Sequence, residues 1–130
     1  MTSARVWRER KRRYLNEISV CAGCGRRHYP PRRVCEACGG RAMTPDRMAD
    51  TGTVLSFTIT HVAPEGLTAV VPYAVAILAM DDGTRTMAQV ADVASVADVT
   101  IGMRVRLEFR KVREDGKSGV ISYGHKAVPA

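Results

Sequence analysis

Several features of membrane proteins and of ordinary enzymes are missing from this 130-residue chain. No segment approaches the roughly 20 consecutive apolar residues that a membrane-spanning helix needs. The basic first residues lead into no apolar core of a secretory signal, so we expect a cytoplasmic protein. No glycine-rich phosphate-binding loop is present, and the 3 histidines are scattered singly. Without a phosphate-binding loop or clustered histidines, the sequence offers few residues for a catalytic centre.

Acidic residues are scarce in the first part of the chain. Residues 1–50 contain 12 lysines and arginines against 5 acidic residues, whereas residues 51–130 contain 8 of each. The whole net charge of +7 therefore lies in the first part, and we divide the chain into two domains, residues 1–50 and 51–130. A basic module of this kind faces nucleic acid, a phosphorylated cofactor or an acidic protein, unless its charge serves only solubility.

The 4 cysteines lie in one short segment, in two pairs with two residues between the members of each pair. They are Cys21, Cys24, Cys35 and Cys38. Each pair suits a tight turn whose backbone amides point at the sulfurs, and two such turns give a closed tetrahedral site. The spacing therefore predicts a structural zinc ion held by four thiolates. Rubredoxin-type iron uses the same ligands, and disulfides are the rival in an oxidising compartment.

One histidine and two prolines lie between the cysteine pairs. Because four thiolates already complete a tetrahedron, we expect His28 to be an exposed residue of the ribbon rather than a fifth ligand. Pro30 and Pro31 fix an extended path back toward Cys35. This stretch is interpreted as a rigid crossing between the two turns.

An amphipathic helix is expected over residues 3–19, before the cysteines. Trp7, Tyr14 and Ile18 recur at helical spacing, with arginines and a lysine between them. Glu9 and Arg13 stand four residues apart, which is the spacing of a helical ion pair. A short helix outside a main core presents a surface that is free to dock on a partner.

From residue 52 onward the sequence changes to the two-residue alternation of β-strands. Five strands are predicted, over residues 52–63, 72–80, 83–92, 103–113 and 118–126. Asp81, Asp82 and Gly83 predict the hairpin turn between the second and third strands. The alternation places Phe57 and Phe109 on the inward faces of their strands. Five short strands of this kind suit a small closed Greek-key barrel of the OB type, so the fold is expected to be mainly β.

Ordered motifs run along nearly the whole chain. They are Arg13-Tyr14 at the helix end, the cysteine pairs around Tyr29-Pro30-Pro31-Arg32 and Val34-Cys35, Gly52-Thr53-Val54, Pro72-Tyr73, Ile101-Gly102-Met103 with Val105, and the tail Tyr123-Gly124-His125-Lys126. This set resembles the zinc-ribbon and OB-fold proteins that accompany thiolases and related acyl-CoA enzymes. The tail is similar to the Tyr-Gly-Tyr-Lys tail of archaeal members that work with thiolase and hydroxymethylglutaryl-CoA synthase, with a histidine in place of the second tyrosine.

The resemblance implies an N-terminal helix, a rubredoxin-like zinc ribbon and a five-stranded OB-fold barrel, in that order. It also implies a non-catalytic accessory subunit rather than an enzyme. Such a scaffold forms a hetero-oligomer with acetoacetyl-CoA thiolase and HMG-CoA synthase, or with a related thiolase-like acyltransferase. It holds its partners together and helps to form the passage that binds CoA or acyl-CoA.

Binding of CoA needs several cationic donors, because CoA carries a diphosphate and a ribose phosphate. The expected helix and ribbon supply arginines, together with rings able to cover the pantetheine or stack on adenine. Our candidate CoA-binding residues are Trp7, Arg12, Tyr14, Arg26, Arg27 and Tyr29, with Arg8, Lys11, Arg32 and Arg33 as further cations.

Two other functions compete with this hypothesis. Zinc ribbons and OB barrels also bind nucleic acid, and the pI of the sequence is about 9.7. An OB groove for single strands normally carries exposed aromatic rings, whereas the expected barrel is neutral overall and poor in them. The other alternative is an enzyme. If all four cysteines bind a metal, however, no thiol is left to act as a nucleophile paired with a base. His61 is expected to lie on a strand as a packed or edge residue rather than to act as a base.

Overall fold

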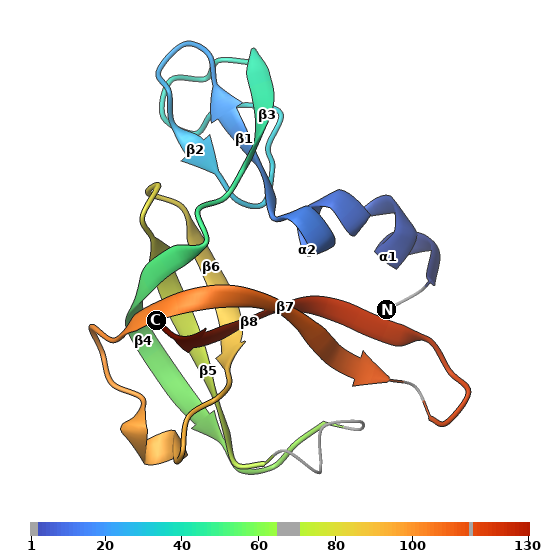
Figure 1. Ribbon diagram of the computed structural model, residues 1–130. Coiled ribbons are helices and arrows are strands. Elements are labelled where there is room, and N and C mark those ends of the chain that lie inside the picture. Colours follow the sequence, from blue (N-terminus) through green and yellow to red (C-terminus); the bar gives the residue numbers. More distant parts are fainter. Residues whose placement is uncertain (1–2, 65–70, 115) are drawn as a thin grey trace.

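The computed structural model describes residues 3–64, 71–114 and 116–130. Two short helices, α1 (Ser3–Arg8) and α2 (Arg10–Leu15), lead into a small three-stranded sheet, which is followed by a closed five-stranded barrel (Figure 1). The fold is mainly β, as the sequence predicts.

The small sheet is built around β1 (Glu17–Cys21). This strand pairs antiparallel with β2 (Arg27–His28) on one side and with β3 (Met43–Arg47) on the other. Ile18 of β1 is fully buried, and it belongs to the same hydrophobic cluster as Met48 and the interior residues of the barrel. The small sheet and the barrel therefore share one core.

The single helix expected over residues 3–19 is wrong in two respects. The helix is interrupted at Glu9, although the predicted ion pair with Arg13 is present at 3.4 Å. It then ends at Asn16, whose φ of 51° lies in the left-handed region and stops helical continuation. Ile18 consequently sits on a strand and not on the helical stripe with Trp7, because burial in the shared core overrides the helical spacing.

The barrel consists of five strands in the order β4-β5-β6-β8-β7, closed by pairing between β4 and β7. The strands are β4 (Thr51–Thr60), β5 (Tyr73–Met80), β6 (Arg85–Val90), β7 (Arg104–Glu114) and β8 (Ile121–Pro129). A short 3₁₀ helix, η2 (Val96–Asp98), lies between β6 and β7. The predicted barrel is confirmed, and so is the turn at Gly83, whose φ is 89°. His61 lies beyond the end of β4 and is exposed, so its expected place on a strand is wrong.

The two phenylalanines are not hidden, contrary to expectation. Phe109 is 52% exposed, because β7 and β8 extend past the barrel as a long hairpin beneath the helices (Figure 1). Phe109 keeps the alternation of the buried Leu107, but the barrel interior has already ended at that point. Phe57 faces the same side as the buried Ala76, yet it is 36% exposed, on the part of β4 that follows the bulge at Leu55.

Gly52 marks the closest approach of β4 to β5. A Cβ atom added there would lie 2.7 Å from the carbonyl oxygen of Ala79 and 3.1 Å from the Cα atom of Met80. Both neighbours are backbone atoms and cannot rotate away. We predict that Gly52→Ala lowers the free energy of unfolding by roughly 1–3 kcal/mol, as measured by urea denaturation.

The exposed Thr58 of the same strand provides the control. Thr58→Ala should change the free energy of unfolding by less than about 1 kcal/mol. Equal losses in the two variants would show that the contact at Gly52 is relieved by an easy movement of the strands.

Candidate metal centre and ligand-binding surfaces

The four cysteine sulfurs converge at the far end of the small sheet. All four Sγ atoms lie within 4.8 Å of one another, and the Cys21–Cys38 and Cys24–Cys35 Sγ pairs are each 3.5 Å apart. Four sulfurs placed about 2.3 Å from a central zinc ion would be about 3.8 Å apart. A disulfide would bring two sulfurs to about 2.05 Å. The sulfurs are therefore spaced as metal ligands and not as bonded pairs.

Each cysteine pair closes a similar turn. The N–H of Gly25 donates to the carbonyl oxygen of Cys21 at 2.8 Å, and the N–H of Gly39 donates to that of Cys35 at 3.0 Å. Gly25 and Gly39 have φ values of 74° and 72°, in the left-handed region that glycine adopts without strain. The first cysteine of each pair is buried and the second is exposed.

Backbone amides favour the thiolate form at the first cysteine of each pair. The N–H of Cys24 lowers the pKa of Cys21 to about 6, and the N–H of Cys38 lowers the pKa of Cys35 to about 7. At Cys38 the N–H of Gly40 also lowers the pKa, but hydrogen bonds with the neighbouring thiols outweigh it and raise the pKa to about 12. Two thiolates form readily, and a divalent cation would allow the remaining thiols to ionise.

His28 is buried beside the sulfur cluster, so its expected exposure is wrong. It is 4% exposed, because β2 pairs with β1 and turns this residue inward. A hydrogen bond from the His28 ring is one of the causes that lower the pKa of Cys35. Its Nε2 atom has no hydrogen-bond partner among the described residues.

A basic pocket of about 420 Å³ opens between the small sheet and the turn that joins β5 to β6. Arginines from both modules line it, together with His28, Tyr29 and Thr84. The lining arginines are Arg26, Arg27, Arg32 and Arg85. The barrel thus adds a fourth arginine to three from the ribbon.

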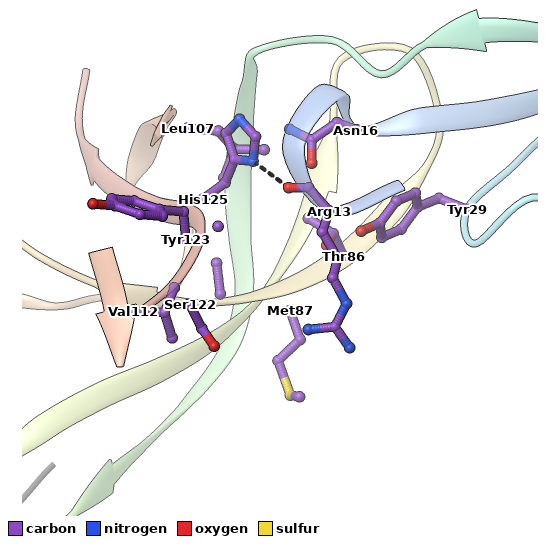
Figure 2. A pocket seen from close by; sticks show the side chains of 12 residues that line it. Arg13, Asn16, Tyr29, Thr86, Met87, Leu107, Val112, Ser122, Tyr123 and His125 are labelled. Atoms are coloured by element: carbon purple, nitrogen blue, oxygen red, sulfur yellow. Dashed lines mark hydrogen bonds between the residues drawn. The ribbon is translucent and has the colours of Figure 1, made fainter. Parts of the chain in front are cut away.

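A second cavity, of about 210 Å³, lies between α2 and the barrel, and Figure 2 shows the side chains that line it. Met87, Leu107 and Val112 supply apolar surface. Arg13, Asn16, Tyr29, Thr86 and Ser122 supply polar atoms. Asn16 is 3% exposed, and its Nδ2 atom has no hydrogen-bond partner among the described residues. We call this cavity the junction groove.

His125 ties the last strand to α2 at the edge of the junction groove. Its Nδ1 atom lies 3.2 Å from the backbone oxygen of Arg13 (Figure 2), and because a carbonyl only accepts, Nδ1 carries the proton. Phe109 stacks on Tyr123 with ring centres 5.5 Å apart, and it meets Tyr14 and His125 edge to face at 5.6 Å each. This aromatic cluster anchors the helix on the β7–β8 hairpin.

Four of the six candidate CoA contacts lie close together. Tyr29 lines both the basic pocket and the junction groove. Arg26 and Arg27 line the basic pocket, and Arg12 lies beside Tyr29 on an adjoining open surface that Met87 also lines. These residues surround the seam between ribbon and barrel.

The other two candidates lie elsewhere. Trp7 is 67% exposed on α1, where the Arg10 guanidinium covers its ring at 4.3 Å from the ring centre. Tyr14 belongs to the aromatic cluster. Asn16 and Arg85 carry no signal in the sequence that marks them as site residues, since their places at the seam depend on how the two modules pack.

Comparison with known proteins agrees with this architecture. Residues 17–44 match the family model described as ChsH2, rubredoxin-like zinc ribbon domain, and residues 46–110 match ChsH2, C-terminal OB-fold domain. The DUF35 domain-containing scaffold protein of Methanocaldococcus jannaschii is 36% identical over 126 residues, which are 96% of this chain and 89% of that protein. This chain belongs to the ChsH2/DUF35 family.

Other members of the ChsH2/DUF35 family show the same correspondence. A DUF35 domain-containing scaffold protein of Pyrococcus furiosus is 31% identical, and the match covers 99% of this chain and 93% of that protein. A chain of the solved Ltp2-ChsH2(DUF35) aldolase superposes with a TM-score of 0.72 at 26% identity, covering 99% of this chain and 96% of that chain. The resemblance drawn from the motifs is confirmed. No helix among the described residues is long and apolar enough to cross a membrane.

The His125 contact predicts a pH dependence of stability. Burial lowers the pKa of His125 below its ordinary value of 6.5, so the unfolded chain binds the proton more readily than the folded protein. The free energy of unfolding should therefore decrease as the pH falls from about 7.5 to about 5.5.

The variant His125→Asn keeps an N–H, on Nδ2, at the position of the histidine Nδ1 that contacts the backbone oxygen of Arg13, but does not titrate. Its free energy of unfolding should change less over the same pH range, as measured by urea denaturation at both ends. Identical pH dependence in the two proteins would assign the titration to another group.

Proposed function

We propose that this protein is a zinc-binding, non-catalytic scaffold subunit of a thiolase-type acyl-CoA complex, in which it holds partner enzymes together and contributes to the passage that binds CoA. The observation that carries the proposal is its full-length match to proteins described as DUF35 domain-containing scaffold proteins. The likeness to a chain of the Ltp2-ChsH2(DUF35) aldolase supports a role inside an enzyme complex.

Zinc is the metal that we assign to Cys21, Cys24, Cys35 and Cys38. The spacing of the four sulfurs, the amides that favour thiolates and the match to a rubredoxin-like zinc ribbon model support the assignment. Four thiolates leave no open coordination position, so the ion would be structural. It would order a small sheet whose own apolar interior is minimal.

Metal analysis should find close to one zinc per chain. Cys35→Ser should lose the metal together with the order of residues 17–44, because the turn at each cysteine pair is held by the ion as well as by its hydrogen bonds. Elemental analysis and amide NMR spectra would measure the two effects. Ala37→Ser, in the same turn, is the control and should keep both.

Two results would contradict the zinc assignment. Stoichiometric iron with rubredoxin-like absorption would replace the metal. Loss of zinc from Cys35→Ser with an unchanged NMR spectrum of the ribbon would remove the structural role.

The basic first module is the surface that we propose for the partner. All of the net positive charge lies before residue 51. An exposed Trp7 and arginines on α2 and the ribbon are residue types that concentrate binding energy at interfaces. Joining the helix and ribbon to the barrel through one core would let the barrel hold this surface in position.

The barrel surface favours a protein partner over nucleic acid. OB folds bind oligonucleotides mainly on the outer face of their second and third strands, which here are β5 and β6. That face presents mainly the aliphatic side chains of Val75, Ile77, Ala79 and Met87, and Tyr73 at the start of β5 is the one aromatic residue of these two strands. The exposed Phe109 and Tyr123 are occupied in stacking on each other, on other strands.

Assembly with the thiolase-like partner tests the proposed function. The variant Arg12→Gln, Arg26→Gln, Arg27→Gln should weaken assembly at least tenfold, by an estimate of roughly 1.5 kcal/mol or more lost in total from charge-assisted contacts. Glutamine is preferred to glutamate because each arginine is paired with a carboxylate, such as Arg12 with Glu9 at 2.6 Å. The dissociation constant of the reconstituted complex is the measurement.

The control for this experiment must leave the barrel intact. Arg104 is unsuitable, because it holds both carboxylate oxygens of Asp81 at 2.8 Å. Lys117→Gln, in the loop between β7 and β8, should assemble normally. Normal assembly of the triple variant, tighter binding to single-stranded DNA than to the partner, or turnover of acetyl-CoA by the chain alone would contradict the proposed function.

A further inference from the structure

The basic pocket between ribbon and barrel is lined mainly by cationic side chains. Four arginines line it, and Glu36 is the one acidic residue among its lining residues. Its volume of about 420 Å³ lies within the usual range of roughly 300–1,000 Å³ for small-molecule sites. The arginines come from three separate segments, so the cluster exists only in the folded protein.

The ribbon arginines are held in place before any ligand arrives. Glu36 bridges Arg26 at 2.7 Å and Arg32 at 3.5 Å. Arg27 is held by Asp46 at 2.8 Å and by Asp82 at 3.5 Å. Groups that are already ordered lose less conformational entropy when they bind. The pocket therefore presents fixed donors instead of freely moving surface side chains.

Two groups at the pocket have capacity left for a ligand. Arg85 has no carboxylate partner within the part of the chain that the structure describes. His28 is more than nine-tenths buried, lines the pocket and has an Nε2 atom without a hydrogen-bond partner in that same part of the chain. A buried, unpaired polar atom is costly, and a ligand group able to hydrogen-bond with Nε2, such as a hydroxyl, would remove the cost.

We infer that this pocket binds the phosphate groups of a small-molecule ligand, either a phosphate monoester or a diphosphate. Guanidinium groups match phosphate oxygens as paired donors, and the four arginines outnumber the carboxylates of Glu36, Asp46 and Asp82 that pair with them, which leaves positive charge for an anion. The nucleotide end of CoA carries both kinds of phosphate, and choosing it as the source rests on the proposed function.

The surroundings of the pocket fit a ligand that has an uncharged part as well. Tyr29 lines the basic pocket, the junction groove and the open surface between them, and Arg85 lines the basic pocket and that surface. A ligand anchored by its phosphates would continue past Tyr29 toward Met87 and Thr86.

Calorimetric titration of the full zinc-loaded chain tests the inference, with pyrophosphate, adenosine 3′,5′-bisphosphate and CoA as the probes. Arg85→Ala should weaken binding of each probe by about tenfold, since it removes a charged donor without breaking an ion pair. Arg41→Ala is the matched control: Arg41 is an exposed ribbon arginine outside the pocket lining. Its variant should bind within about twofold of the unmodified protein.

The probes also separate the sources of phosphate. Tighter binding of the bisphosphate and CoA than of pyrophosphate would identify a nucleotide, and equal binding would show that the phosphate groups alone are recognised; either result supports a phosphate site. Equal weakening in the Arg85 and Arg41 variants, or no binding of any probe, would overturn it. Single-stranded DNA that binds more tightly than the bisphosphate and depends on Arg85 would also overturn it.

Assembly of the unmodified protein with its partner is measured separately. Assembly without binding of any probe would overturn the phosphate site and leave the scaffold function standing. Probe binding without assembly would leave the phosphate site standing and count against the scaffold function.

Discussion

The burial of Ile18 and Met48 in the barrel interior is the interaction on which the rest of the structure depends. Ile18 comes from the small sheet and Met48 from the connection to β4, and both pack in one cluster with residues such as Val54 and Val105. A metal-stapled sheet of three short strands has little apolar interior of its own. Sharing the barrel core removes the freedom of the two modules to move relative to each other, which is the property that a scaffold requires.

Both cavities follow from this shared core, because they lie along the seam that it closes. Asp82, in the turn between β5 and β6, accepts a hydrogen bond from the N–H of Ala49 at 2.9 Å and approaches Arg27 of the ribbon at 3.5 Å. Asn16 lies at the same seam, and its backbone carbonyl oxygen accepts a hydrogen bond from the N–H of Met48 at 3.0 Å. Polar side chains of distant segments are therefore fixed against one another, and the site residues are properties of the packed pair of modules.

This dependence explains what the sequence could and could not predict. The cysteine cluster could be predicted from the spacing of the cysteines, and the barrel from the alternation of apolar and polar residues in its strands. Both patterns can be recognised within short segments of the sequence. The burial of His28, the end of the helix at Asn16 and the place of Arg85 are set by contacts between segments far apart in the sequence. Phe109 shows a different limit, since alternation indicates the face of a strand but not where the barrel behind that face ends.

Charge pairing gives the seam its distinct chemical character. In the barrel, Arg104 pairs with Asp81 and Arg110 pairs with Asp92 and Glu108, and Arg104 holds the pKa of Asp81 well below its usual range. In these pairs the positive charge of each arginine is balanced by a neighbouring carboxylate, so this part of the barrel surface attracts anions only weakly. Arg85 departs from this pattern, because it sits at the one end of β6 that meets the ribbon arginines. The barrel thus adds an arginine without a carboxylate partner among the described residues to the arginines that the ribbon brings to the pocket.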